Sequence, residues 1–282
     1  MANALDAGTG RLGDLEVPRM GYGAMQLAGP RVTGPPADRD RAERALRTAV
    51  ELGVRHLDTS DFYGPYVVNE LIRETLAPYP DDLVIVTKVG ARRDDAGGWL
   101  SALGADDLRR AVHENLEHLG IDRLDVVNLR VMGTDVEIAE PFAVLAGLRE
   151  EGLIRHLGVS EVDADQVARA RSVAPVVCVQ NLYNVADRGD DALVDACAAE
   201  GIAYVPYFPL GSAFRPFEAA GLETVAKRHD ASVHQVALAW LLRRSPAILV
   251  IPGSSDPAHV ADNVAAGSLV LTDEDLAELG AP

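Results

Sequence analysis

The sequence has few cysteines, very little lysine and no long apolar run. Cys178 and Cys197 are its only cysteines, which excludes a disulfide framework and a cysteine-ligated zinc site. No apolar run approaches the roughly 20 residues that are needed to span a bilayer. The first residues lack the basic and apolar regions of a secretory signal. We therefore expect a cytoplasmic protein that does not insert into a membrane.

The charge balance is strongly acidic, with a formal net charge of −17. Nucleic acid binding requires a basic surface, and the sequence contains no Lys/Arg cluster of that kind. The acidity also disfavours anionic membranes, although a local pocket can still bind an anionic cofactor. Only Lys88 and Lys227 are lysines. A lysine kept inside an apolar segment, as Lys88 is, therefore indicates a special role.

Apolar runs alternate with amphipathic segments along the chain. Most of the runs are continuously apolar, as in strands that are buried on both faces. We predict strands at Pro18–Gly23, Val54–Asp58, Leu83–Lys88, Leu124–Arg130, Ile154–Ser160, Val176–Asn181, Ile202–Tyr207 and Ile248–Gly253. Helical spacing, often followed by a glycine stop, predicts helices at Arg39–Leu52, Ala105–Leu119, Ile138–Glu151, Asp190–Glu200, Ser232–Arg243 and Pro257–Ala265.

This alternation predicts the fold class. About eight βα units without a linker indicate one α/β domain over residues 1–282, folded as a (β/α)₈ TIM barrel. A doubly wound open sheet is the main alternative, but the first strand is not followed by a G-x-G-x-x-G fingerprint. The segment GTGRLGDLEVPRMG, residues 8–21, predicts an N-terminal β-hairpin that caps the bottom of the barrel.

Reactive side chains follow the predicted strands at their carboxyl ends, where barrel active sites lie. Asp58, Lys88 and Arg130 end three strands, and Tyr63 follows the first of them. A nearby ammonium favours the phenolate form of tyrosine, so Tyr63 could act as a general acid that Lys88 tunes and Asp58 orients. Arg130 could donate hydrogen bonds to a carbonyl oxygen that gains charge. The set predicts carbonyl reduction.

Each of these residues also has a purely structural interpretation. A loop tyrosine is commonly a packing residue, and a buried Lys–Asp pair is often structural. Arg130 could form a salt bridge with Asp58 or Glu161. Four such groups on adjacent strand ends favour a site over coincidence.

The sequence resembles a known family in five segments. HLDTSDFYG, VIVTKVG, LREEGLIRHLGVS, VPYFPLG and IPGSSDPAHVADN are similar to aldo-keto reductase signatures, in the same order. The resemblance extends from PRMGYGAM to the last helix. Within the superfamily, GYGAMQLAGP, DTSDFYGP, VTKVGARR and LDVVNLRVM are most similar to the bacterial pyridoxal reductase (pyridoxine 4-dehydrogenase) branch.

The resemblance implies NADPH-dependent reduction of an aldehyde to an alcohol, without a metal. It places Asp58, Tyr63 and Lys88 in the catalytic tetrad, with Arg130 where most of the superfamily has histidine. The same arginine occurs in the pyridoxal-reductase-like branch. Arginine stays cationic at accessible pH, so it can donate hydrogen bonds but cannot relay a proton.

The resemblance also implies a set of cofactor contacts. Ser160 and Gln180 would bind the nicotinamide carboxamide, with Glu161 in place of the usual asparagine, and Tyr207 would stack on the nicotinamide ring. The remaining residues would lie along the pyrophosphate and the adenosine: Pro209, Leu210, Gly211, Ser254, Ser255, His259 and Asn263. Gly253 and His259 replace basic residues often found there, so NADH is possible as well, although NADPH is still the cofactor that the resemblance implies.

The substrate is expected to be a small-molecule carbonyl compound. Trp99 could stack on an aromatic ring and Arg92, next to Arg93, could meet a polar substituent. A pyridoxal-like aldehyde is the first hypothesis. The alternatives are a cofactor-binding regulatory or redox-sensor protein of the same fold, and a biosynthetic keto-reductase for a sugar or polyketide carbonyl. No sequence feature sets an oligomeric state.

Overall fold

A computed structural model of the chain describes residues 2–94, 96–211 and 220–280; the remainder of the predicted domain lies outside the described residues. Its main element is a seven-stranded parallel sheet with the order β11-β10-β9-β8-β5-β4-β3. The strands are β3 (Tyr22–Gly23), β4 (His56–Asp58), β5 (Val84–Val89), β8 (Leu124–Arg130), β9 (Ile154–Ser160), β10 (Val176–Gln180) and β11 (Ala203–Tyr204). Seven predicted strands therefore overlap strands of this sheet, although Pro18 belongs to a separate hairpin and β11 is shorter than predicted.

The predicted strand Ile248–Gly253 is not a regular strand. It forms isolated parallel bridges instead, from Ile248 to Tyr204 and from Val250 to Met20. The Gly21 and Leu249 amides donate across these junctions, to Val250 at 2.8 Å and to Tyr204 at 2.9 Å. The neighbouring strands β3 and β11 are two residues long, which leaves little ladder for a regular strand to join. Segment 248–250 nevertheless connects the two edges of the sheet.

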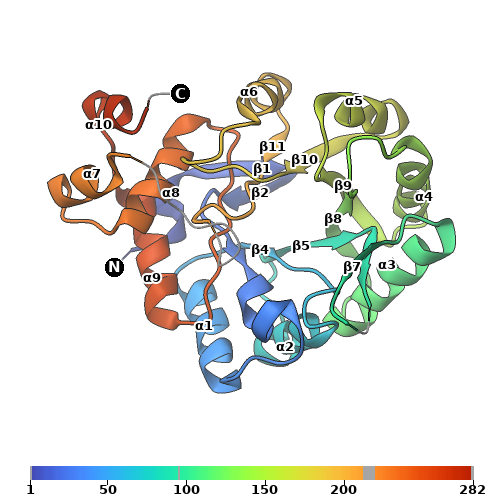
Figure 1. The fold of residues 1–282 in the computed structure, drawn as a ribbon. Helices are drawn as coiled ribbons and strands as arrows, with labels where there is room; N and C mark the ends of the chain where they lie inside the picture. Colours follow the sequence, from blue (N-terminus) through green and yellow to red (C-terminus); the bar gives the residue numbers. More distant parts are fainter. Residues whose placement is uncertain (1, 95, 212–219, 281–282) are drawn as a thin grey trace.

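Helices lie around the outside of the sheet (Figure 1). They are α1 (Arg39–Glu51), α2 (Val67–Leu76), α3 (Ala105–Leu119), α4 (Ala139–Glu150), α5 (Ala164–Val173), α6 (Asp191–Glu200), α7 (Leu222–Arg228), α8 (Val233–Arg244), α9 (Pro257–Ala265) and α10 (Asp273–Glu278). The six predicted helices are present within one residue at each end. The glycine stops have the expected cause at Gly120 and Gly201, which take the left-handed conformation that ends a helix.

Two hydrophobic cores hold the sheet. The larger core lies between the sheet and the helices. The smaller one includes residues of several strands, among them Val86, Val126 and Cys178, together with Leu12 and Val17. Leu12 and Val17 come from an antiparallel hairpin, β1 (Thr9–Leu12) and β2 (Leu15–Pro18). The hairpin expected in residues 8–21 is thus present, and its apolar side chains are part of the smaller core.

A second antiparallel hairpin was not predicted. It consists of β6 (Ala91–Arg93) and β7 (Trp99–Ser101), directly after β5. Arg93 holds it against the 31–33 segment by donating to the carbonyls of Arg31 and Val32, both at 3.1 Å. This hairpin positions the side chains that were expected to meet the substrate.

Within the described residues, no helix has both the length and the apolarity to cross a membrane.

Candidate active site

Asp58 and Lys88 form a buried ion pair at the carboxyl ends of β4 and β5. Lys88 Nζ donates to Asp58 Oδ1 at 2.6 Å and to the Thr59 carbonyl at 3.0 Å. Gln180 Nε2 donates to the other Asp58 oxygen at 2.7 Å. Both charged residues are 3% exposed. Because each Asp58 oxygen has a partner, the carboxylate is held in one orientation and in turn fixes the ammonium.

Tyr63 lies over this pair, in the loop between β4 and α2. Its ring centroid is 5.2 Å from Lys88 Nζ, and the residue is 7% exposed. Burial alone would lower the pKa of Lys88, but the attraction of Asp58 and of Tyr63 outweighs it and raises that pKa. Lys88 is therefore an ammonium at neutral pH. A fixed positive charge beside a phenol is the arrangement that supports proton transfer from the hydroxyl.

The cluster opens into a cavity of about 390 Å³, a volume that suits a small ligand. Asp58, Tyr63, Lys88, Arg130 and Gln180 line it, together with Trp99, Tyr207 and the residues expected near the pyrophosphate, Pro209, Leu210 and Gly211. The structure thus brings all four expected catalytic residues to one cavity, although they come from three strands and a loop.

Glu161 occupies the position where the resemblance implies an asparagine. It has a left-handed backbone, φ 62°, and its carboxylate accepts a hydrogen bond from the Tyr207 hydroxyl. Its other oxygen lies 4.0 Å from Arg130. The Arg130 guanidinium carbon is 5.9 Å from the ring centroids of both Trp99 and Tyr207. Glu161 therefore contacts the side chains on the wall of the cavity and can orient both Tyr207 and Arg130.

Two buried polar atoms beside the cluster have no hydrogen-bond partner among the described residues. They are Ser160 Oγ and Gln180 Oε1, on side chains that are 0% exposed. Their residues are paired across β9 and β10. A hydroxyl donor beside an amide acceptor matches the carbonyl and NH₂ of a carboxamide. Because buried polar atoms are rarely left unpaired, the pair fits the nicotinamide carboxamide that the resemblance implies.

The residues expected near the adenosine lie in the segment before α9 and within this helix, outside the lining of the cavity. Ser254 Oγ accepts from the Asp256 amide at 3.1 Å, and Asp256 caps the helix. His259 is exposed and Asn263 is 7% exposed. The structure adds Arg41, a residue of α1 that forms an ion pair with Asp256. This cation is 215 positions away from Asp256 in the sequence, so no local motif could have indicated it.

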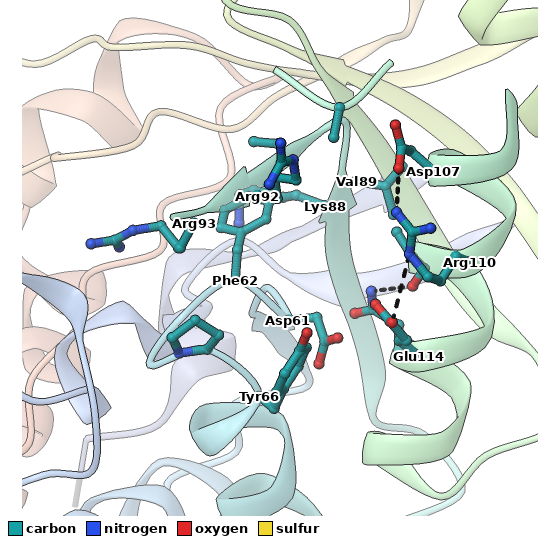
Figure 2. A pocket seen from close by; sticks show the side chains of 15 residues that line it. Asp61, Phe62, Tyr66, Lys88, Val89, Arg92, Arg93, Asp107, Arg110 and Glu114 are labelled. Atoms are coloured by element: carbon teal, nitrogen blue, oxygen red, sulfur yellow. Dashed lines mark hydrogen bonds and ion pairs between the residues drawn. The ribbon is translucent and has the colours of Figure 1, made fainter. Parts of the chain in front are cut away.

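Arg92 does not line the cavity that holds Tyr63, contrary to expectation. It lines a neighbouring pocket of about 230 Å³ (Figure 2). Trp99 does line the larger cavity, and Arg93 is 4.2 Å from the Trp99 ring centroid. Arg92 and Arg93 both belong to β6 and both line the smaller pocket, and neither lines the cavity that holds Tyr63.

Several lining residues of the larger cavity had not been predicted. Phe62 forms an edge-to-face contact with Trp99, with ring centroids 5.3 Å apart. Phe62 is adjacent to Tyr63, but its motif carries no sign of that contact. Arg31 and Gln26 line the same cavity from the loop after β3. Among the described residues, no group of three or more His, Cys, Asp or Glu side chains could hold a metal ion.

With the geometry established, comparison with known proteins defines the class. The model of the Aldo/keto reductase family matches residues 19–281, so the chain belongs to the aldo/keto reductase family. It is 54% identical to pyridoxine 4-dehydrogenase from Escherichia coli over 281 residues, which cover 98% of each chain.

Two solved structures extend the comparison. A thermostable aldo-keto reductase in complex with the inhibitor epalrestat has a TM-score of 0.81 and 30% identity, covering 96% of this chain and 98% of its own. An aldo-keto reductase from Klebsiella pneumoniae, in complex with NADPH, has a TM-score of 0.82 and 28% identity. The match covers 99% of this chain and 94% of the Klebsiella chain. The expected family membership is confirmed.

Proposed function

We propose that this chain is an NADP(H)-dependent oxidoreductase that interconverts a small aromatic aldehyde, of the pyridoxal type, with its primary alcohol. The observation that carries the proposal is the buried Asp58–Lys88 pair under Tyr63, in a cavity that Arg130 also lines. The 54% identity to a pyridoxine 4-dehydrogenase supports the substrate class. We propose further that the sheet, segment 248–250 and the surrounding helices form one (β/α)₈ barrel domain.

Ser160 and Gln180 would hold the nicotinamide through the two unpartnered atoms described above. Tyr207, oriented by Glu161, would lie against the ring. Pro209, Leu210 and Gly211 would follow the pyrophosphate, and Ser254, Ser255, His259 and Asn263 the adenosine end. When bound, the reduced cofactor supplies a hydride to the carbonyl carbon. NADPH complexes of relatives support NADPH as the cofactor, and NADH remains a second cofactor to test.

The proton would come from this chain. The Tyr63 hydroxyl would donate a proton to the carbonyl oxygen, while Lys88, which stays charged, would stabilise the phenolate that remains. Asp58 keeps the ammonium in place and receives no proton. Arg130 would donate hydrogen bonds to the oxygen or to a neighbouring ring substituent. Trp99 would stack on the ring of the substrate.

The test is Tyr63→Phe, assayed with pyridoxal and with both NADPH and NADH. We expect turnover to fall by at least about 100-fold, since general acid catalysis contributes on that order, while the dissociation constant for the cofactor is unchanged. Cofactor fluorescence measures the binding. Unchanged turnover would reject Tyr63 as the acid. Tight cofactor binding by the wild type without turnover on any aldehyde would instead favour a regulatory protein.

A further inference from the structure

A buried carboxylate near the proposed site has no part in the reaction proposed above. Asp61 is located in the same loop as Tyr63, and it is 6% exposed. Its side chain lines the smaller pocket, on the side of Tyr66 and Glu114 (Figure 2). Phe62 and Lys88 line both cavities, so the smaller pocket and the proposed site share these two side chains.

Asp61 is tied to two helices. His118 of α3 lies with Nδ1 2.8 Å from Asp61 Oδ1, and Asn69 of α2 donates to the same oxygen at 3.1 Å. Asn69 also donates to Asn115 Oδ1 at 3.0 Å. A carboxylate that receives bonds from side chains of two helices ties the loop to both of them.

The same network continues to Lys88. Thr59 Oγ1 donates to Asn69 Oδ1 at 2.7 Å, and Thr87 Oγ1 donates to Asn115 at 2.6 Å. The Thr59 carbonyl is an acceptor for Lys88 Nζ, and Thr87 precedes Lys88 in β5. The four uncharged members are 0% exposed: Thr59, Thr87, Asn69 and Asn115. Water therefore does not compete for these hydrogen bonds. They hold Thr59, whose carbonyl accepts from Lys88 Nζ, and Thr87, which precedes Lys88 in the chain.

The backbone of the loop is held at both ends of the Asp61–Tyr66 segment. The Tyr66 amide donates to the Asp61 carbonyl at 2.7 Å, and the Tyr63 amide donates to the Ser60 carbonyl at 3.1 Å. Tyr63 thus lies within the Asp61–Tyr66 turn, and its own amide forms the second of these bonds. A shift of Asp61 would therefore move the Tyr63 ring relative to Lys88. Lys88 itself belongs to β5, and its Nζ is hydrogen-bonded to the Thr59 carbonyl.

We propose that Asp61, together with its partners His118 and Asn69, is a positioning residue: it sets the place of Tyr63 relative to Lys88, and its protonation through the smaller pocket modulates turnover. This inference rests on the proposed function. The ionised carboxylate is the stronger acceptor for Asn69 and His118, so ionisation holds the loop and protonation loosens it.

The groups around Asp61 place its titration near neutrality. Burial raises its pKa to about 6, against the lowering effects of His118 and of the Asn69 hydrogen bond, while Glu114 raises it further. The surrounding groups are His118, Glu114 and Arg110 of α3, with Tyr66 at the start of α2. The same pocket is also lined by the charged residues Lys88 of β5, Arg92 and Arg93 of β6, and Asp107 of α3. Arg110 is engaged by Asp107 and lies 3.9 Å from Glu114. Proton exchange at Asp61 therefore falls within the pH range in which enzymes are assayed.

The experiment is the pH profile of kcat from pH 5 to 8 for the wild type, Asp61→Asn and the matched control Asp107→Asn. Asp107 lines the same pocket but contacts no member of the network. We expect the wild-type kcat to fall below about pH 6 by about 10-fold, because small misplacements of reacting groups cost that much or more. In Asp61→Asn we expect no such fall of kcat below pH 6, while KM and the cofactor dissociation constant stay near the wild-type values. In the control Asp107→Asn, kcat should fall below pH 6 as it does in the wild type.

A second readout does not depend on turnover. Hydrogen exchange of the Tyr63 and Tyr66 amides should speed up below pH 6 in the wild type, after correction for intrinsic rates, and should not change in this way in Asp61→Asn. His118→Gln replaces Asp61→Asn if that variant does not fold, and it should lower kcat at pH 7.5. Identical profiles and exchange in the wild type and Asp61→Asn overturn the inference. A wild type without turnover but with the expected exchange contradicts the proposed function alone.

Discussion

At the scale of single residues, Arg130 is the main departure from the family pattern. Its guanidinium is 4.0 Å from Glu161, and its side chain is 25% exposed. A pair that is this long and partly solvated contributes less than about 1 kcal/mol to stability. The buried Nε of Arg130 has no partner among the described residues. Both observations favour a role toward the substrate over a structural one.

We therefore predict that Arg130→Ala lowers kcat/KM for aldehyde reduction by about 100-fold, the typical cost of removing one donor to a developing oxyanion. The midpoint of thermal unfolding should hardly change. Arg130→Lys should recover only part of the loss, since lysine lacks the planar fork. Arg92→Ala is the matched control, because Arg92 lines the other pocket. A variant that loses stability but keeps wild-type constants would make Arg130 structural.

At the scale of elements, the N-terminal hairpin has a packing role. Leu12 is 0% exposed and belongs to the interior core with Val86, Val126 and Leu249. Gly10 of the same hairpin lies so close to the sheet that an added Cβ would be 2.5 Å from Leu249. Strand β1 therefore packs closely against segment 248–250.

We predict that Leu12→Ala lowers the free energy of unfolding by about 2–5 kcal/mol, the usual range for a buried leucine. Urea denaturation measures it. Leu5→Ala, which truncates a side chain that is 57% exposed, should change it by less than about 0.5 kcal/mol. Cofactor affinity should be the same in both variants. Equal small effects at Leu5 and Leu12 would show that the hairpin does not contribute to the core.

The elements that were predicted correctly share a local signal. Strand β8 and helices α3 and α9 have the bounds that their apolar pattern and end residues indicate. Strand β11 and segment 248–250 are less regular than predicted, because their ladders depend on partners elsewhere in the chain. The β6–β7 hairpin was missed since its residues are mainly charged or glycine, and Arg92 of this hairpin lines the smaller pocket.

At the scale of the whole molecule, acid stability depends on a buried histidine. His56 is 0% exposed, and neither ring nitrogen has a partner among the described residues. Burial lowers its pKa from 6.5 to about 4, with Asp58 opposing and Lys88 adding to the shift. The unfolded chain therefore binds a proton at pH 6 and the folded chain does not. The contribution to stability is complete above pH 6.5 and is lost as the pH falls toward 4.

We predict that His56→Asn reduces the loss of unfolding free energy between pH 7 and pH 5 by about 2 kcal/mol, at about 1.4 kcal/mol per unit below pH 6.5. Urea denaturation at both values gives the difference. His113→Asn changes an exposed histidine and should leave the pH dependence as it is. The contribution of Asp61 to the unfolding free energy changes with pH in the opposite direction, since a carboxyl group with a raised pKa lowers stability as the pH rises. Equal losses in the His56 and His113 variants would contradict the prediction.

The sequence by itself determined the alternation of strands and helices and the types of reactive side chain at the strand ends. Both follow from signals within a few residues: apolar periodicity, helix ends and the polar residue after each apolar run. Tertiary structure decided which of these side chains meet. Gln180 reaches Asp58 across 122 positions, and His118 reaches Asp61 across 57. The physical reason is that such contacts depend on strand register, on the connection of the sheet's edges and on helix packing, for which no local pattern carries a signal.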